Sequence, residues 1–453
     1  MNKTASILKT TIFALISLTI LGYPLTQCKS EFPTYRVVLD PGHGGVLKYP
    51  IRKHGDRYDP VKMRYIDSFK PGATYGSMSE KYLMYPIAEK TNKLLSYLKP
   101  GGDFQKFQKI LKKYTNKATP RIYIKTLMSR KKSITWKNSK KQKDPNAPYR
   151  LFDYPDAKGK MQPGRLTVIN KFKPQLVVSL HCARYQISNY KGMNPVLLAP
   201  YSLLKKGLMH LQGKKRMKNP YKYPLIKSWF MESGKRTRFQ WFLNDTAMYY
   251  TAFNIHKNLR INYKRYRGYR YNMLKWSYND PKDWQIEARK HKPNSPYSYH
   301  YKTIKPKGIF WTRERNKFEE YRRNKGYEGY GGDNAFASYE LIRFIQYNLK
   351  KQGDRDKELM PGKPYVSIWI VPQHVNAICA YLELGYLRRW QDRKRLSKKQ
   401  DQIAEGLAVG IYSLFTGIKV KKSRFSHAPK GLKLNLSKYK INNNSSYFDR
   451  VVK

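Results

Sequence analysis

Four side chains in this sequence have the types needed for metal-assisted hydrolysis. His43 and His181 each follow a short apolar run. Glu80 opens a stretch with helical spacing, and Glu383 is the lone acid in a third apolar run. Two histidines and a carboxylate with an open coordination position form a catalytic zinc site of the type that peptidases use. A second carboxylate that does not bind the metal can take a proton from water and pass it to a leaving amine.

Each of these residues also has an ordinary structural interpretation. A histidine after a strand is more often a hydrogen-bonded loop residue. Glu80 near a helix start interacts favourably with the helix dipole without any metal. Glu383 has Arg388 and Arg389 close by in the sequence as ion-pair partners. The spacing is not a compact motif such as H-E-x-x-H, so the hypothesis depends on all four residues meeting in the fold.

The segment 36–45 has the pattern that would position the first histidine. Three apolar residues precede Asp40, and glycines surround His43, which predicts a buried strand running into a sharp turn. Residues 175–183 predict a second such strand, with His181 near its end. Because sites in open α/β sheets form at the carboxyl ends of strands, we expect the two histidines to meet there.

The remaining pattern alternates strands with helices. We expect helices over 80–98, 103–118, 165–172, 335–349 and 403–415, and strands over 121–126, 193–199, 368–371 and 377–385. Residues 46–79 and 128–164 are polar and are predicted to be loops. Ser77 or Ser79 can cap the first helix, and Pro86 lies in its first two turns, where proline is better tolerated than deeper in a helix.

An excess of positive charge distinguishes the composition. The 453 residues include 91 Lys and Arg against 30 Asp and Glu, a formal net charge of +61. Such an excess predicts contact with a polyanion, which is nucleic acid, an anionic membrane or an acidic wall polymer. A solvated basic surface without a partner explains the charge equally well. Hydrophobic residues make up 40% of the chain, which is enough for a core and argues against wholesale disorder.

The segment 1–28 has the organisation of a secretory signal. Two lysines precede an apolar run over 11–21 that is short for a membrane-spanning helix. Residues 25–28 resemble a bacterial lipobox, in which Cys28 would be lipidated, although Gln27 replaces the usual small residue. Simple secretion and an uncleaved anchor are the alternatives. All three predict an exported protein of the periplasm or cell envelope, which argues against a nucleic-acid partner.

Composition divides the rest of the chain. We expect residues 29–200 and 333–418 to form two parts of one domain, 201–332 to be a basic, aromatic-rich insertion, and 419–453 to be a basic polar tail that frays. The aromatic side chains of the insertion could stack on sugars or bases while its basic side chains bind a neighbouring anion. A locally packed, solvated flap would have the same composition.

Two of the three cysteines, Cys182 and Cys379, lie inside apolar runs. We expect buried free thiols there. A disulfide between them would require their strands to be neighbours.

The motifs resemble, in order, those of the zinc-dependent N-acetylmuramoyl-L-alanine amidases of the amidase-3 family, which cleave cell-wall peptidoglycan. Residues 37–45 are close to the opening motif of the family, which carries its first zinc histidine, here His43. Glu80, before a helix, matches the zinc glutamate of the family. The strand that ends at His181 matches the one with the second zinc histidine.

The later segments match as well. Arg165 and Asn170 match the helix before the second zinc strand, and residues 381–386 match the strand with the catalytic glutamate, here Glu383. Residues 403–411 resemble the last helix of the family.

The sequence departs from the family pattern in three places. Cys182, Ala183 and Arg184 replace the small residues and the asparagine usual after the second histidine, and the strand near 121–126 lacks a clear Thr-Arg pair, although Arg130 follows. The insertion has no counterpart in the family.

The resemblance implies one α/β domain with a mixed, mostly parallel sheet and helices on both faces. It also implies that His43, Glu80 and His181 hold Zn²⁺ and that Glu383 deprotonates water. The water would attack the amide between N-acetylmuramic acid and L-alanine, for cell-wall remodelling or daughter-cell separation. Peptidoglycan is the implied partner, and a lipid anchor with basic residues would add an anionic membrane surface.

Three other functions stay open at this point. The first is a non-catalytic, envelope-binding lipoprotein that keeps the fold without binding metal. The second is an exported nucleic-acid-binding protein, which rests on charge and aromatic content alone. The third is a metal-dependent peptidase with another substrate.

Overall fold

The computed structural model describes residues 32–56, 58–59, 64–65, 68–185, 192–198, 332–367, 371–372, 375, 377–423, 425–442 and 445–446. The signal segment 1–28 lies outside these residues, as does the whole insertion apart from Gly332. The chain from Tyr35 onward forms one compact unit.

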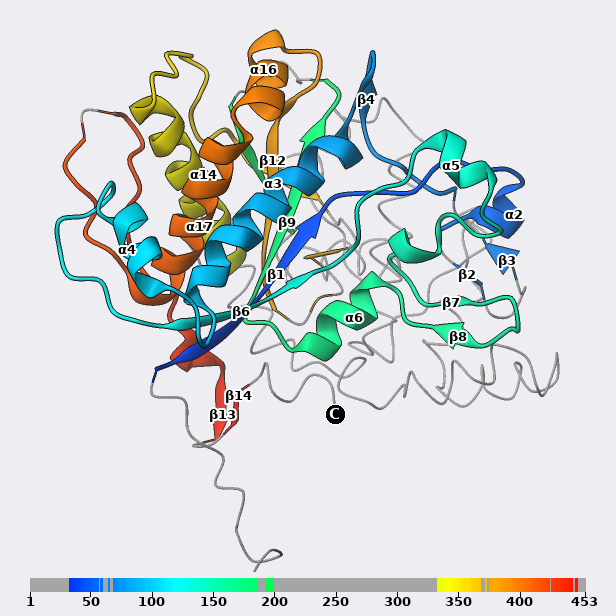
Figure 1. The fold of residues 1–453 in the computed structure, drawn as a ribbon, viewed down its shortest axis with the longest axis horizontal. Coiled ribbons are helices and arrows are strands. Elements are labelled where there is room, and N and C mark those ends of the chain that lie inside the picture. Colours follow the sequence, from blue (N-terminus) through cyan, green and yellow to red (C-terminus); the bar gives the residue numbers. More distant parts are fainter. Residues whose placement is uncertain are drawn as a thin grey trace, which may run out of the picture. The chain divides into compact units, whose positions relative to one another are not determined.

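Six strands form one mixed sheet in this unit (Figure 1). They are β1 (Thr34–Pro41), β6 (Tyr123–Met128), β9 (Leu176–Ala183), β10 (Asn194–Leu198), β11 (Tyr365–Ser367) and β12 (Ile378–Tyr386). Their order is β11-β10-β12-β9-β1-β6. β1, β9 and β12 run parallel, as do β10 and β11, whereas β10 is antiparallel to β12. The predicted mixed, mostly parallel sheet is therefore confirmed.

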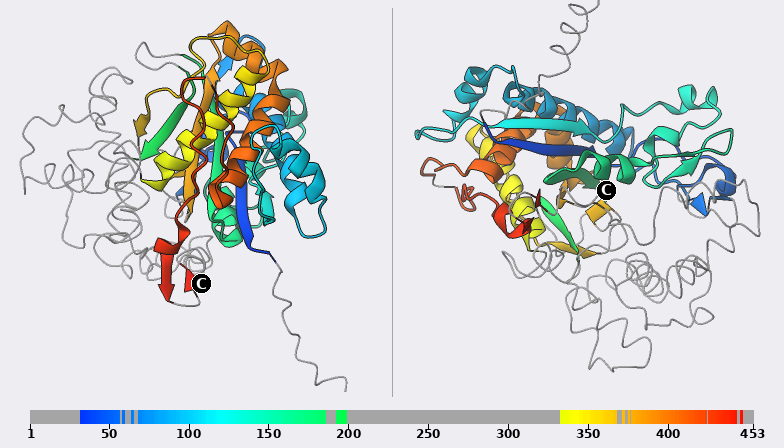
Figure 2. Two further views of the ribbon diagram at one scale, coloured as in Figure 1. Left: turned by 90° about the vertical axis from the view of Figure 1, so that its left-hand side faces the viewer. Right: turned by 90° about the horizontal axis from the view of Figure 1, so that it is seen from below.

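Helices cover both faces of the sheet (Figure 2). The main ones are α3 (Glu80–Leu95), α4 (Phe104–Leu111), α6 (Arg165–Phe172), α14 (Asp333–Lys351), α16 (Trp390–Lys398) and α17 (Gln400–Thr416). α3, α14 and α17 pack together on one face, and α6 packs on the other. Within the described part of the chain, every helix is too short or too polar to cross a membrane.

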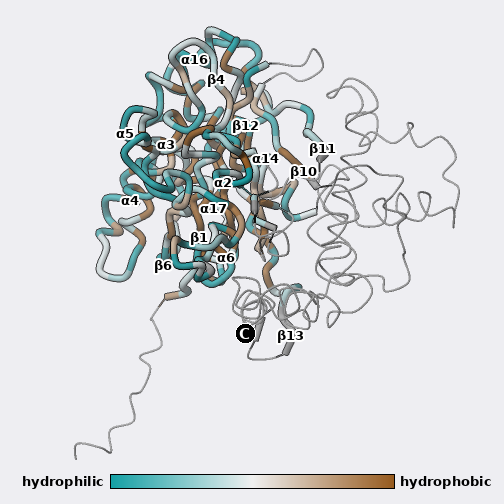
Figure 3. Tube along the Cα trace, turned by 90° about the vertical axis from the view of Figure 1, so that its right-hand side faces the viewer, coloured by the Kyte–Doolittle hydropathy of each residue, from teal (hydrophilic) through white to brown (hydrophobic). Residues whose placement is uncertain are grey.

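The strand residues divide between these two faces by their alternation. Val37 and Leu39 of β1 point to the core under α3, α14 and α17, whereas Val38 points to the core under α6 together with Val177 of β9. Successive side chains of a strand face opposite sides, so a sheet that is covered on both sides needs continuous apolar runs. Figure 3 shows the result, with hydrophobic residues along the packed strands and hydrophilic ones over α5 (Trp136–Lys140).

Two glycines allow α17 to approach α14 closely. A Cβ atom on Gly406 would lie 2.7 Å from Cα of Ile345, and one on Gly410 would lie 2.9 Å from the Leu341 side chain. A larger residue at position 406 would require backbone movement, and one at position 410 would require the neighbouring side chain to shift. The helix pair that supports the central strands therefore depends on these glycines.

The start of α3 is the element that presents Glu80. Ser79 occupies the N-cap position, but its side chain makes no capping hydrogen bond. The backbone N–H of Glu80 instead donates to the carbonyl oxygen of Ala73 at 2.9 Å. Pro86 lies inside the helix, as predicted.

Several predicted boundaries need correction. The helix predicted over 103–118 is the shorter α4, and the strand at 121–126 lies at Tyr123–Met128. The strand β11, at Tyr365–Ser367, comes just before the strand predicted over 368–371. Residues 368–370 are outside the described residues. The polar segments predicted as loops contain short elements, which are α2 (Ile51–His54), β2 (Tyr58–Asp59), β3 (Arg64–Tyr65), β4 (Thr74–Tyr75), β5 (Met78–Ser79), α5, a 3₁₀ turn at Ala147–Tyr149, β7 (Tyr154–Pro155) and β8 (Met161–Gln162).

The expectation that the tail frays from Lys419 onward is wrong for its described residues. The backbone of Leu434 donates to Leu414 of α17, and that of Gly431 donates to the buried Glu340 of α14. Tyr439 is fully buried, and its hydroxyl donates to Asp333 at 2.6 Å. A few well-placed apolar and hydrogen-bonding residues outweigh the polar composition of this segment.

The two cysteines are free and buried, as predicted. Cys182 of β9 belongs to the core under α3, α14 and α17, and Cys379 of β12 belongs to the core under α6. Their side chains are thus on opposite faces of neighbouring strands, which explains why neither pairs with the other.

Candidate metal centre and active site

His43 lies just past β1, on a backbone that bends sharply. Its φ angle is 59°, in the left-handed region, and those of Gly44 and Gly45 are 136° and 59°. The ring nitrogen Nδ1 lies 2.9 Å from the carbonyl oxygen of Lys70, which can only accept a hydrogen bond. Nδ1 therefore carries the proton, and the unprotonated Nε2 faces Glu80 at 3.4 Å from Oε2.

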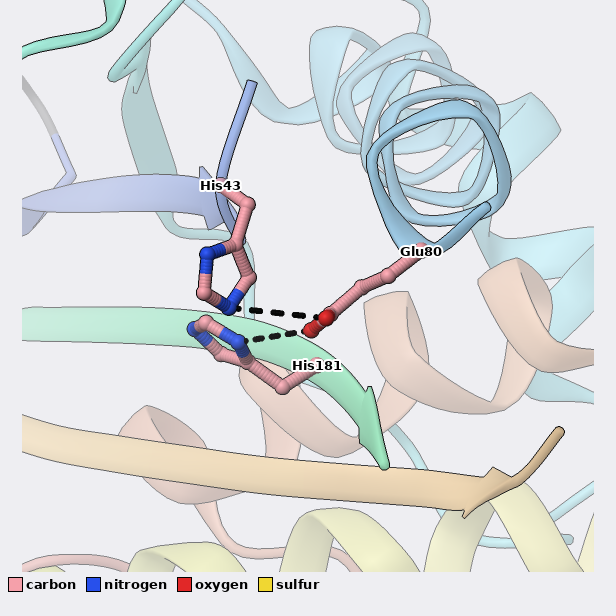
Figure 4. Close-up of side chains that lie close together, drawn as sticks. All are labelled: His43, Glu80 and His181. Atoms are coloured by element: carbon pink, nitrogen blue, oxygen red, sulfur yellow. Dashed lines mark hydrogen bonds and ion pairs between the residues drawn. The ribbon is translucent and has the colours of Figure 1, made fainter. Parts of the chain in front are cut away.

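Glu80 joins the two histidines (Figure 4). Its Oε1 lies 2.8 Å from Nδ1 of His181 and accepts the backbone N–H of Cys182 at 3.1 Å. Its Oε2 accepts the backbone N–H of Ala73 at 2.7 Å. Burial opposes the negative charge, but the neighbouring His43 and His181 outweigh it and lower the pKa of Glu80. The carboxylate is thus ionised and held by three elements of the fold.

His181, on β9, is held between an aromatic ring and a glycine. The ring of Tyr381 stacks on it with centroids 4.1 Å apart and an interplanar angle of 8°. Gly42 lies so close that a Cβ atom there would be 2.4 Å from Cε1 and Nδ1 of the imidazole. The remaining ring nitrogen, Nε2, lies 3.2 Å from Oγ of Ser179. These contacts leave the imidazole little freedom to rotate.

The three side chains fit a tetrahedral divalent metal such as zinc. One nitrogen or oxygen from each of His43, Glu80 and His181 lies within 4.8 Å of the others. Two ligand atoms that are each about 2.0–2.1 Å from a tetrahedral Zn²⁺ are about 3.3 Å apart, close to the 3.4 Å between Nε2 of His43 and Oε2 of Glu80. Nδ1 of His181 lies at a hydrogen-bonding distance of 2.8 Å from the other oxygen, Oε1. Burial lowers the pKa of His43, and the nearby His181 lowers it further, while Glu80 opposes the shift. A neutral imidazole is the form that binds metal.

Glu383 lies on β12 beside this group. The parallel register places it directly opposite His181, and it is 6% exposed. Residues in register on parallel strands point to the same face, at the strand spacing of about 5 Å. Asp40, Ser179 and Tyr381 form the preceding row of the same face. The face that is apolar at Val38, Val177 and Cys379 therefore becomes polar toward the carboxyl edge.

A buried network under the site involves residues to which the sequence assigned no role. Asp40 pairs with Arg165 and accepts hydrogen bonds from the hydroxyls of Ser129 and Ser179, at 2.5 and 2.6 Å. Burial raises its pKa, but the Arg165 guanidinium and the two hydroxyls outweigh that effect and keep the pKa below its usual value. Arg165 also donates to the carbonyl oxygen of His43 at 3.3 Å. The network thereby fixes the turn that presents the first histidine.

Arg130 connects the end of β1 to the start of α3. Its guanidinium donates to the carbonyl oxygens of Pro41, which ends β1, of Gly42 and of Lys81 in α3, at 2.8–3.1 Å. The sequence signal for this role was the arginine found shortly after the predicted strand. No pattern in the sequence could show which carbonyl groups it binds.

The site residues predicted from the sequence thus come together at the carboxyl edge of the sheet. A His, His and Glu cluster at this edge of a mixed α/β sheet has the arrangement of a metal-dependent hydrolase. The sequence model of the family described as N-acetylmuramoyl-L-alanine amidase (Amidase_3) matches residues 37–413. The chain belongs to this family of enzymes, which hydrolyse an amide of peptidoglycan. The prediction of an amidase is therefore confirmed.

Solved structures of amidases are similar at low identity. The CwlD amidase from Clostridioides difficile, solved in complex with the GerS lipoprotein, is 13% identical, with a TM-score of 0.31 and coverage of 83% of this chain and 96% of that chain. Ami1 from Mycobacterium smegmatis is 9% identical, with a TM-score of 0.32 and coverage of 83% and 94%. None of the curated proteins matches the chain significantly. The description of the site therefore depends on the family match and on the geometry of this chain.

Proposed function

We propose that this amidase uses Zn²⁺ held by His43, Glu80 and His181 to hydrolyse the amide between N-acetylmuramic acid and L-alanine. The observation that carries the proposal is the convergence of these three donors at the sheet edge, with Glu383 in register opposite His181. Zinc in such a site polarises the amide carbonyl and makes water more acidic.

Side chains of the protein transfer the proton and orient the metal-binding imidazoles. Glu383 takes a proton from the attacking water and transfers it to the nitrogen of L-alanine as the carbon–nitrogen bond breaks. The products are the lactyl carboxylate of the sugar and a free amino terminus on the peptide. The carbonyl of Lys70 and the ring of Tyr381 keep the two imidazoles in the orientation that the reaction needs.

The setting is the cell envelope. The signal-like segment 1–28 supports export, with lipidation at Cys28 as the anchored form, and the net charge of +61 suits the anionic wall and membrane surfaces. We assign residues 201–332 the role of an insertion that shields or gates the candidate metal site. Deleting residues 205–328 should change wall binding or activity, and an unchanged enzyme would remove that role.

The direct test measures zinc content and wall-digest products together, on purified residues 29–453 and on a His43→Ala variant. We expect one zinc per chain and new L-alanine amino termini from peptidoglycan, both lost in the variant. His427→Ala is the matched control, because this histidine lies outside the cluster. Zinc without cleavage would contradict the proposed reaction and point to another amide. The absence of both zinc and cleavage would favour an envelope-binding lipoprotein with the same fold.

A further inference from the structure

Two arginines lie beyond the proposed metal ligand and base, at the carboxyl ends of the same two strands. Arg184 follows β9, three positions after His181, and Arg388 lies five positions after Glu383. The backbone N–H of Arg388 donates to the carbonyl oxygen of Arg184 at 3.0 Å. At about 3.3 Å per extended residue, Arg184 is roughly 10 Å along the chain from His181.

A β-bulge in β12 produces this pairing. Glu383 is opposite His181, but Tyr386 is opposite Ala183, so three steps on β12 match two steps on β9. A bulge bends its strand and changes the direction of the side chains that follow. The backbone N–H of Tyr386 donates to Asp392 of α16 at 3.0 Å, which holds the bent chain in place.

The two guanidinium groups lie against one aromatic ring. Cζ of Arg184 is 5.0 Å and Cζ of Arg388 is 5.1 Å from the ring centroid of Tyr185. Tyr185 is 48% exposed, and both arginines are exposed. Cation–π attraction holds each guanidinium near the ring, although the two positive charges repel one another. An anion bound between them would remove this repulsion and could accept paired hydrogen bonds.

The nearby acids are engaged by other arginines. Arg389 binds Asp356 at 2.6 Å, and Arg395 binds Asp392 at 2.6 Å. Among the residues that the structure describes, no carboxylate lies within ion-pair distance of Arg184 or Arg388. The described acids therefore leave the positive charge at this end of β9 and β12 uncompensated.

The chemistry of the substrate supplies an anion at the right distance. The carboxyl group of N-acetylmuramic acid is consumed in the scissile amide, so the free carboxylates of peptidoglycan belong to its stem peptide. An extended peptide advances about 3.3–3.6 Å per residue, so a carboxylate on the second or third stem residue is roughly 7–11 Å from the scissile amide. This range includes the roughly 10 Å of extended chain estimated between His181 and Arg184.

We propose that Arg184 and Arg388, held by Tyr185, form a subsite for a free carboxylate of the stem peptide. The inference rests on the proposed function and adds a source of specificity to it. Wall peptides with free carboxylates are the preferred substrates, and peptides with amidated carboxylates are disfavoured.

The test compares two muropeptides that differ only in whether the carboxylates of the second and third stem residues are free or amidated. We expect wild-type residues 29–453 to prefer the free form by about tenfold or more in kcat/KM, as charged hydrogen bonds do. The ratio should fall to near one in the Arg184→Gln/Arg388→Gln double variant. Arg121→Gln is the matched control, because this exposed arginine also contacts two rings, of Phe104 and Tyr123, but at the amino end of β6.

A second measurement separates binding from turnover. In a Glu383→Gln background, the dissociation constants of both muropeptides show the preference without any cleavage. Equal preference in the wild type and the double variant would overturn the subsite while leaving the amidase reaction intact. Loss of cleavage of both muropeptides by the wild type would instead overturn the proposed function, and the subsite with it.

Discussion

Glu383 and His181 are direct neighbours in the parallel register of β12 and β9. The same ladder of backbone hydrogen bonds therefore positions the proposed base and one proposed metal ligand. The proposed zinc ligands are other residues, so a change confined to the head group of Glu383 should separate chemistry from metal binding.

Replacing Glu383 by Gln should reduce kcat by about 10²–10⁴-fold, because the amide cannot accept the proton of water. Zinc content should stay at one per chain, as measured by atomic emission on the purified variant. Glu405→Gln is the control, because it removes a carboxylate from α17, where Glu405 contacts Lys113. Full activity of Glu383→Gln would remove this residue from the mechanism.

Replacing Gly42 by Ala should weaken zinc binding about 10–100-fold, because the new methyl group would displace the imidazole of His181. Competition with a chromophoric chelator measures this affinity. Gly76→Ala is the control: it introduces the same methyl group at a φ of 55°, but nothing lies within 4 Å of it. Equal zinc affinity of the two variants would show that zinc binding does not require the observed position of the His181 imidazole.

Replacing Asp40 by Asn should lower the free energy of unfolding by about 3–5 kcal/mol, because Arg165 would remain buried without its counter-charge. Urea denaturation at neutral pH measures the change. Asp401→Asn removes an exposed ion pair with Lys90 and should stay close to the wild type. A similar decrease in the free energy of unfolding of both variants would show that burial does not make the Asp40–Arg165 pair more important for stability.

The ion pairs of Asp356 predict a specific dependence of stability on pH. Burial raises its pKa, but hydrogen bonds from Arg389 and Arg395 outweigh this effect and leave the pKa well below its usual value. A carboxylate with a lowered pKa stabilises the fold above its unfolded-state pKa of about 4, and this contribution is lost as the pH falls further.

Asp356→Asn should therefore cost about 1–3 kcal/mol at pH 7, and its difference from the wild type should shrink below about pH 4. Chemical denaturation across this range gives both values. A difference that is constant with pH would show that the charge of Asp356 does not contribute.

The sequence predicted the central strands and the long helices because their apolar runs and periodicities are strong. It also predicted that His43 and His181 meet, since strand ends in an α/β sheet share one edge, and the family resemblance implied that Glu80 and Glu383 join them. The same strands have a period-two pattern, in which Asp40 follows Val38 on one face. That pattern indicates the polar edge of the sheet.

Other features depend on contacts between segments far apart in the sequence. No local pattern indicates that Arg130 binds carbonyl groups at the end of β1 and the start of α3, or that the Lys70 carbonyl orients His43. The packing of the tail also depends on such contacts, because its polar composition does not indicate that Tyr439 is buried against α14.

The site residues fall into two groups that differ in how much of the fold must open before they can move. Every residue of β12 and all but the last residue of β9 are buried, so His181 and Glu383 should move only when the whole domain opens. The side chain of His43 is 22% exposed, and both it and Glu80 depend on the loop before α3, through Lys70 and Ala73. Opening of that loop alone would release one side of the cluster, which provides a route for the metal to exchange in the folded enzyme.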